Sequence, residues 1–242
     1  MSSAAAAKIL GFLQRVDAER LRRNVTPGLS AKVGAVKRYQ QRRFALTYAD
    51  LLRSQRYGAA ASFFLEELYG PADFSARDAQ FARVVPALVR LFPEEVVRAV
   101  ATLGELHALS EGLDTAMGLN LLEASVDARA YTLAWQRSGS PAERTRQIEL
   151  TLHLGESLDR LTRKSLFRRG LRMMRRPAHS AGLGELQSLL ESGFDAFVAM
   201  QGAQEFLALV ESRERGLCEK LYAEQTGDGE WSSRAKERLG IP

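Results

Sequence analysis

Apolar residues recur along most of the chain at the three- and four-residue spacing of an amphipathic helix. In the first such stretch, residues 3–23, one side carries Ile9, Phe12, Leu13 and Val16. Runs of alternating β-branched residues, which are typical of strands, are missing from the sequence. The pattern therefore predicts an all-α fold, a single multi-helix bundle of about eight to nine helices joined by short turns.

Capping residues and helix breakers set the expected helix ends. Ser140-Pro141-Ala142-Glu143 is the clearest start, with a cap, a proline in the first turn and a glutamate at the third position. Ser30 is a second expected cap, and Ser75 with Asp78 resembles a capping box. The expected helices span about residues 3–23, 30–54, 57–69, 75–91, 93–112, 113–137, 140–176, 183–201 and 203–224.

Glycine and proline residues predict the remaining helix ends and bends. Gly112 is expected to end one helix, and Pro177 is expected to halt the long helical stretch before it. Within that stretch we expect a bend at Gly155 or Gly170. Pro86 should kink its helix.

The sequence gives no sign of a boundary between separate domains. The sequence has no repeat of 20–50 residues and no long Ser/Gly/Pro linker. We expect one helical domain over residues 1–242, with a mobile tail at 225–242. The alternative is a subdivision near residues 138–140.

Composition excludes several protein classes. The 242 residues are 45% hydrophobic and 26% charged, so one core can form without disulfides or metals. A single Cys218 cannot form an internal disulfide, which favours a cytoplasmic location. No apolar run reaches the ~20 residues that span a bilayer, and Lys8 interrupts the candidate signal stretch. Membrane, secreted, fibrous and disordered classes are therefore not expected.

The distribution of charge is more informative than its total of +5. Arginine supplies 28 of the 34 basic residues. Residues 1–56 carry +9 and residues 159–176 carry +7, so the remainder of the chain carries −11. Two basic blocks in an acidic chain can attract an anionic partner. The alternative is that they lie against the chain's own acidic helices.

The second basic block, residues 160–176, has two sides on a helical wheel. The apolar side carries Leu166, Phe167, Leu171, Met173 and Met174. Gly170 lies in that apolar stripe, where it permits close helix contact or a bend. The basic side carries the candidate anion-binding residues Lys164, Arg168, Arg169, Arg172, Arg175 and Arg176. Because guanidinium binds phosphate and carboxylate bidentately, the expected partner is an acidic protein, a nucleic acid or an anionic lipid surface.

One segment carries a family resemblance. Its residues are Phe63, Phe64, Leu65, Glu66, Glu67, Leu68 and Tyr69, followed by Gly70-Pro71. This stretch resembles the signature of the bacterial FFLEELY-motif proteins. The resemblance implies a stand-alone helical domain of uncharacterised function and supplies no reaction or site. The motif residues themselves are expected to be structural.

Glu67 lies at the edge of the apolar face that this motif forms. An unpaired buried carboxylate is costly, so we expect an arginine partner such as Arg42 or Arg43. The alternative is a pocket lined by carboxylates.

Two histidine-containing trios suggest another kind of site. His107, Glu111 and Asp114 have the spacing of one helical face, and so do Glu149, His153 and Glu156. The Glu-x-x-His pair of di-iron bundles is absent at both histidines. We therefore predict no metal and no cofactor, and keep a metal or ligand pocket near Glu67, His107 and His153 as the alternative.

Nucleophilic catalysis has no support in the sequence. There is no Gly-x-Ser-x-Gly elbow, and Glu219 beside Cys218 would raise the pKa of the thiol. The leading hypothesis is thus a non-enzymatic binding or adaptor protein with an arginine-rich surface. An enzyme or sensor with the pocket is the second hypothesis, and a structural subunit with a helical interface is the third. The oligomeric state does not follow from the sequence.

Overall fold

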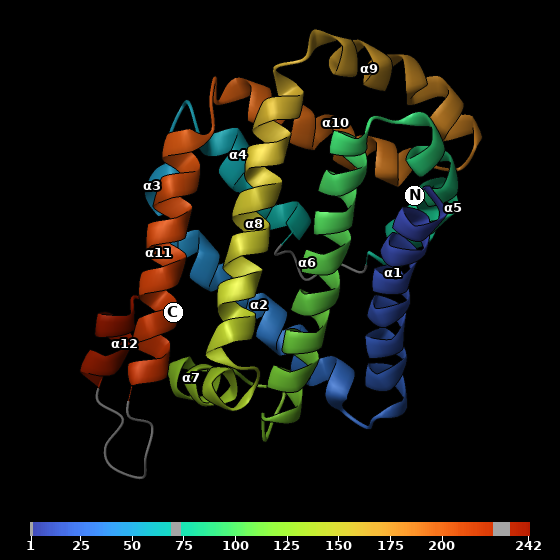
Figure 1. Ribbon diagram of the computed structural model, residues 1–242. Coiled ribbons are helices and arrows are strands. Elements are labelled where there is room, and N and C mark those ends of the chain that lie inside the picture. Colours follow the sequence, from blue (N-terminus) through green and yellow to red (C-terminus); the bar gives the residue numbers. More distant parts are fainter. Residues whose placement is uncertain (1, 69–73, 225–232) are drawn as a thin grey trace.

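The computed structural model describes residues 2–68, 74–224 and 233–242, and this part of the chain is helical without strands (Figure 1). Its twelve α-helices exceed the eight to nine expected, and the all-α class is confirmed. The helices are α1 Ser2–Val25, α2 Leu29–Thr47, α3 Ala49–Leu52, α4 Gly58–Phe63, α5 Ser75–Leu91, α6 Glu94–Leu119, α7 Ala128–Arg137, α8 Pro141–Thr162, α9 Ser165–Ser180, α10 Gly184–Ala199, α11 Gln204–Ala223 and α12 Ser233–Leu239. A π-helix, η1, spans Phe64–Leu68.

Four long helices form the front of the molecule. Figure 1 shows α1, α6, α8 and α11 side by side in that order, and neighbouring members of the series contact each other. Helix α2 lies behind them and packs on α1 and α6. Helices α9 and α10 lie at one end of these long helices, and α7 lies at the other end.

Buried side chains form separate apolar clusters. One joins α2–α4 with α10 and α11 around Phe44, Phe64 and Phe206. A second joins α2, α6, α7 and α11 around Tyr39 and Tyr131, whose rings stack at 4.5 Å. Both clusters combine residues from before and after positions 138–140.

The predicted helix starts had mixed outcomes. The capping box at Ser140 is confirmed, because its side chain accepts from Glu143 N and the Glu143 carboxylate accepts from Ser140 N. Ser30 and Ser75 were wrong as capping residues. Gly28, with φ +74°, precedes α2, and no side-chain bond caps α5 at Phe74. Helix α5 runs through Pro86.

Several predicted helix ends were also wrong. Helix α6 continues past Gly112 to Leu119, and the chain then forms a loop up to the Asp127 cap of α7. The expected helix 30–54 is broken at Tyr48. The long stretch after Ser140 breaks at Arg163 and Lys164, whereas Pro177 lies inside α9.

Neither expected bend glycine ends a helix. Gly155 lies inside α8, where an added Cβ would come within 2.5 Å of Leu207 on α11, so glycine permits close helix contact there. Gly170 is exposed in α9, and nothing lies within 4 Å of its Cβ position. The close contact suggested for Gly170 therefore occurs at Gly155 instead.

The family-resembling motif forms the end of α4 and the π-helix η1. Phe64 is buried against Phe206, with ring centroids 5.7 Å apart, and Phe63 contacts α10 where Gly193 leaves room. Tyr69, Gly70 and Pro71 lie outside the described residues. Phe64 is therefore part of the core, Phe63 and Leu65 are partly buried against it, and Glu66 is exposed.

The end of the chain packs against the body. Of the expected tail 225–242, residues 225–232 lie outside the described part, whereas Ala235, Leu239 and Ile241 are buried. The Tyr39 hydroxyl donates to the carbonyl of Pro242 at 2.7 Å. The last ten residues thus complete the cluster around Tyr39.

A buried arginine fastens the corner between α7 and α8. The Arg144 guanidinium stacks on Trp135, 3.7 Å from the ring centroid, and Nη2 donates to Ser138 Oγ at 3.3 Å. Burial lowers the pKa of Arg144.

Among the described helices, none has the length and apolarity to cross a membrane.

Candidate anion-docking surface

Helix α9 packs on the body through only part of its apolar side. Ala178 is buried and Phe167 and Leu171 are partly buried, and α9 contacts helices α10 and α8. The side chain of Leu166 is outside the described set. This contact fixes which side of α9 faces solvent.

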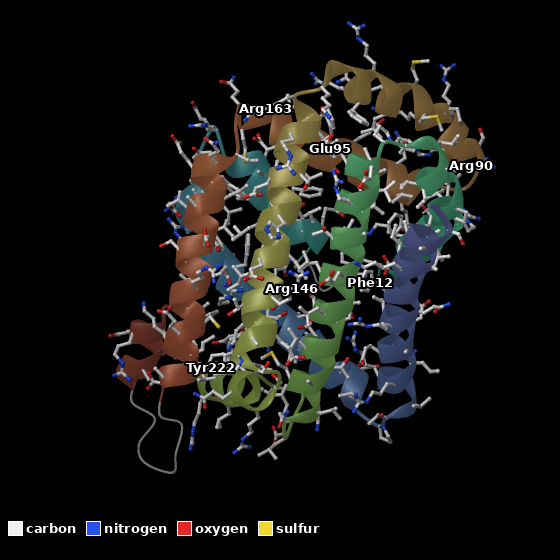
Figure 2. All side chains as sticks on the ribbon, in the orientation of Figure 1. Phe12, Arg90, Glu95, Arg146, Arg163 and Tyr222 are labelled. Atoms are coloured by element: carbon white, nitrogen blue, oxygen red, sulfur yellow. The ribbon has the colours of Figure 1, made fainter. Side chains whose placement is uncertain are left out.

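The beginning of α9 is held by an ion pair. The Lys164 ammonium binds the Glu95 carboxylate in the first turn of α6, and Arg160 lies 3.7 Å from the same carboxylate. The hydrogen bond from Lys164 lowers the pKa of Glu95. Figure 2 shows Glu95 at the end of the molecule where α9 lies.

Two arginines of the predicted row are paired with carboxylates of α10. Arg168 Nη2 donates to Asp195 Oδ1 at 3.2 Å. Arg175 donates to Glu191 through Nε at 3.0 Å and Nη2 at 2.5 Å. The hydrogen bond between Arg175 and Glu191 raises the pKa of the Arg175 guanidinium and lowers the pKa of the Glu191 carboxyl group. Half of the predicted row, counting Lys164, is therefore neutralised within the chain.

The other half of the row is free. Arg169, Arg172 and Arg176 are exposed, and none of the hydrogen bonds or ion pairs in the described residues involves them. Only a longer-range attraction links Arg172 to Glu191. Spacings of three and four residues place the three side chains on one strip of α9. We call Arg169, Arg172 and Arg176 the free arginine strip.

Two methionines are more exposed than the sequence predicted. Met173 is 78% exposed and Met174 is 53% exposed, although both belong to the apolar side of the wheel. The apolar arc of α9 is wider than the surface that α10 and α8 cover. The uncovered part of this arc borders the free arginine strip. The helical wheel already indicated it, because the apolar residues of α9 spread over a wide arc.

The alternative pocket residues on α6 are engaged in a buried network. Glu111 accepts from Arg23 Nη1 and Lys37 Nζ, each at 2.5 Å. Burial alone would raise the pKa of Glu111, but Lys37 and Arg23 lower it to about 2. Burial raises the pKa of Asp114, which accepts from Gln40 at 3.0 Å. Glu111 therefore joins α1, α2 and α6.

His107 belongs to a neighbouring set of contacts. Its Nε2 lies 2.8 Å from Asp78 Oδ2, which also accepts from Arg20 Nη2 at 2.5 Å. Burial would raise the pKa of Asp78, but His107 and Arg20 lower it. Asp78 thus connects α5 to α1 and α6.

The remaining pocket residues lie elsewhere. Glu67 accepts from Arg77 at 3.0 Å, so the expected partners Arg42 and Arg43 were wrong, and Arg43 instead binds Glu214. His153 and Glu156 on α8 are exposed, and Glu149 lies 3.7 Å from Arg146.

The structure does not bring these residues into one metal-binding group. Within residues 2–68, 74–224 and 233–242, no group of three or more His, Cys, Asp or Glu side chains is placed to hold a metal ion. A cavity of about 210 Å³ beside Asp159, Phe197 and Gln201 includes none of the predicted pocket residues.

The chain is similar to a known protein family over most of its length. A family model described as a domain of unknown function, DUF8198, matches residues 19–228. No curated protein and no solved structure shows significant similarity to the chain.

Proposed function

Because the chain belongs to the DUF8198 family, whose description assigns no activity, we propose a function from the α9 surface alone: the protein is a helical adaptor that docks on an anionic partner. Three exposed arginines without a carboxylate partner in the described residues carry this proposal. Guanidinium groups bind phosphate and carboxylate bidentately, so such a strip suits an anionic surface.

The six predicted anion-binding residues have two roles in this proposal. Lys164, Arg168 and Arg175 position α9, since their partners belong to α6 and α10. The free arginine strip faces solvent. An arginine that is already paired offers less to a partner, because it must first give up its own carboxylate.

Presentation on a held helix favours docking. Besides the Lys164 pair, Arg83 of α5 donates to the carbonyl of Gly182 at 2.9 Å, which holds the turn after α9. Both ends of α9 are thus fixed to other helices. A fixed helix loses little conformational freedom on binding.

The test replaces the three arginines of the strip by glutamine, which has a similar helix propensity. The variant R169Q/R172Q/R176Q and the control R22Q/R53Q/R137Q each lower the net charge from +5 by three. The control arginines are exposed and lie on other helices or turns. Binding to phosphatidylserine vesicles, random-sequence duplex DNA and polyglutamate is measured at rising salt.

We expect the strip variant to lose affinity for at least one probe by on the order of 100-fold, at about 1 kcal/mol for each arginine. The control should lose much less, and the difference should shrink as salt screens the charges. If the two triple variants bind every probe alike, the proposal is wrong.

A further inference from the structure

We propose that the anionic partner is a phospholipid bilayer, on which α9 lies at the level of the headgroups. This inference rests on the proposed function and names its partner class. It depends on apolar side chains that a bilayer accommodates and that an aqueous polyanion does not.

The first of these side chains is Met173. It follows Arg169 by four residues and precedes Arg176 by three, so its side chain neighbours both on the helix surface. At 78% exposure it leaves an unbranched apolar side chain in water among cationic groups. An interfacial helix uses this arrangement, since its basic residues meet headgroup phosphates while apolar residues enter the acyl boundary.

More apolar surface lies at the same end of the molecule. Leu91, the last residue of α5, is 68% exposed, and Phe92, which follows it in the connection to α6, is 46% exposed. Phe92 is three residues before Glu95, which binds Lys164 at the start of α9. Figure 2 shows Arg90 and Glu95 at the end of the molecule where α9 lies. Two separate elements therefore present apolar and basic groups at one end.

The carboxylates that pair with the basic side chains of α9 and of its N-cap are already engaged. Glu191 and Asp195 of α10 bind arginines of α9, and Glu95 binds Lys164. Glu94 binds Arg98 within α6 at 2.6 Å. Among the described residues, the free arginine strip is therefore the part of α9 whose positive charge no contacting carboxylate compensates.

The other two partner classes use this surface less well. A single-stranded nucleic acid would gain from aromatic side chains between the arginines, and the free strip has none. A DNA duplex would meet the arginines with its phosphates and leave Met173 without an apolar contact. An acidic protein would pair with the arginines, but its carboxylates would leave Met173 without an apolar contact. A bilayer engages both kinds of side chain. Because Phe167 and Leu171 are already partly buried, contact is shallow and depends on anionic lipid.

The test uses the full chain and vesicles of phosphatidylcholine with increasing phosphatidylserine. The variant M173Q removes the apolar contact, and M173L keeps it. The matched control is L122Q, since Leu122 is 96% exposed in the loop between α6 and α7, away from α9. We expect M173Q to bind phosphatidylserine vesicles about fivefold or more weakly, whereas M173L and L122Q bind like the parent chain.

A second measurement reports insertion directly. In M173W, tryptophan emission should shift to the blue on phosphatidylserine vesicles and be quenched by brominated lipid, whereas L122W should show neither change. Unchanged vesicle binding by M173Q, or unshifted emission of M173W, would overturn the bilayer inference.

The two proposals fail in different ways. Arginine-dependent binding to DNA or polyglutamate without Met173-dependent binding to vesicles leaves the proposed function intact and removes the bilayer. Equal binding of the strip variant and its control to all probes removes both.

Discussion

Glu111, a candidate pocket residue by its spacing in the sequence, links helices of the bundle in the structure. Glu111 is buried with both carboxylate oxygens bound, one by Arg23 of α1 and the other by Lys37 of α2. Arg23 also donates to Thr115 Oγ1 at 2.8 Å. A buried pair stabilises little compared with apolar packing, but the loss of one partner leaves uncompensated buried charge.

Replacing Glu111 by Gln should therefore lower the free energy of unfolding by about 3 kcal/mol at pH 7, because Arg23 and Lys37 lose their counter-charge. Urea unfolding measures the change. The exposed Glu66 offers a matched control, and E66Q should shift stability by less than about 0.5 kcal/mol.

The same carboxylate should shape the acid stability of the protein. Its pKa falls from the ordinary 4.5 to about 2 in the folded chain, so its contribution is fully present above pH 4.5 and is lost as the pH falls toward 2. That shift corresponds to about 3 kcal/mol. The parent chain should lose this much more stability than E111Q between these pH values. Parallel profiles for the two proteins would contradict the assignment.

The sequence predicted part of this residue-level chemistry. The spacing of His107, Glu111 and Asp114 placed them on one face of a helix, and Glu111 and Asp114 are buried together on α6. The cationic partners of Glu111 and the amide partner of Asp114 come from helices 74 to 88 residues earlier in the chain. Pairing over such separations depends on packing and leaves no local sequence signal.

At the scale of the element, local signals located caps better than breaks. The Ser140 capping box is self-contained within four residues and was confirmed. The break at Arg163 has neither glycine nor proline, and it occurs where Lys164 turns toward Glu95 on another helix. Pro177 remains inside α9, where it leaves one backbone hydrogen bond unmade, and α9 follows an arc in Figure 1.

Two helical glycines should respond in opposite directions to the same substitution. G170A should raise the free energy of unfolding by about 0.5–1 kcal/mol, because its Cβ meets no neighbour and alanine favours the helix. G155A should lower it, since its Cβ would lie 2.5 Å from Leu207 Cδ2. Thermal and urea unfolding of both variants measure the difference. Equal effects would show that α8 and α11 do not approach as closely as described.

At the scale of the whole molecule, periodicity predicted the all-α class but not the contacts between distant segments. The polar composition of residues 225–242 indicated a free tail. Three apolar side chains of the last ten residues are nevertheless buried, and the Tyr39 hydroxyl binds the Pro242 carbonyl. A few apolar residues are enough to hold the chain end when they cover an exposed side of the cluster around Tyr39. That exposed side exists only once the helices have packed together, so the local sequence does not show it.

The two ends of the molecule should therefore be separable by mutation. Ile241 is 2% exposed in the cluster that joins α2, α6, α7 and α11, and α9 contributes no residue to that cluster. I241A should lower the free energy of unfolding by about 2–4 kcal/mol, whereas K236A, on the exposed side of α12, should change it by less than about 0.5 kcal/mol. At temperatures where I241A remains folded, its affinity for phosphatidylserine vesicles should equal that of the parent chain. A joint loss of stability and vesicle binding would mean that the arginine strip depends on the packing of the far end, and α9 would then not be an independently held docking helix.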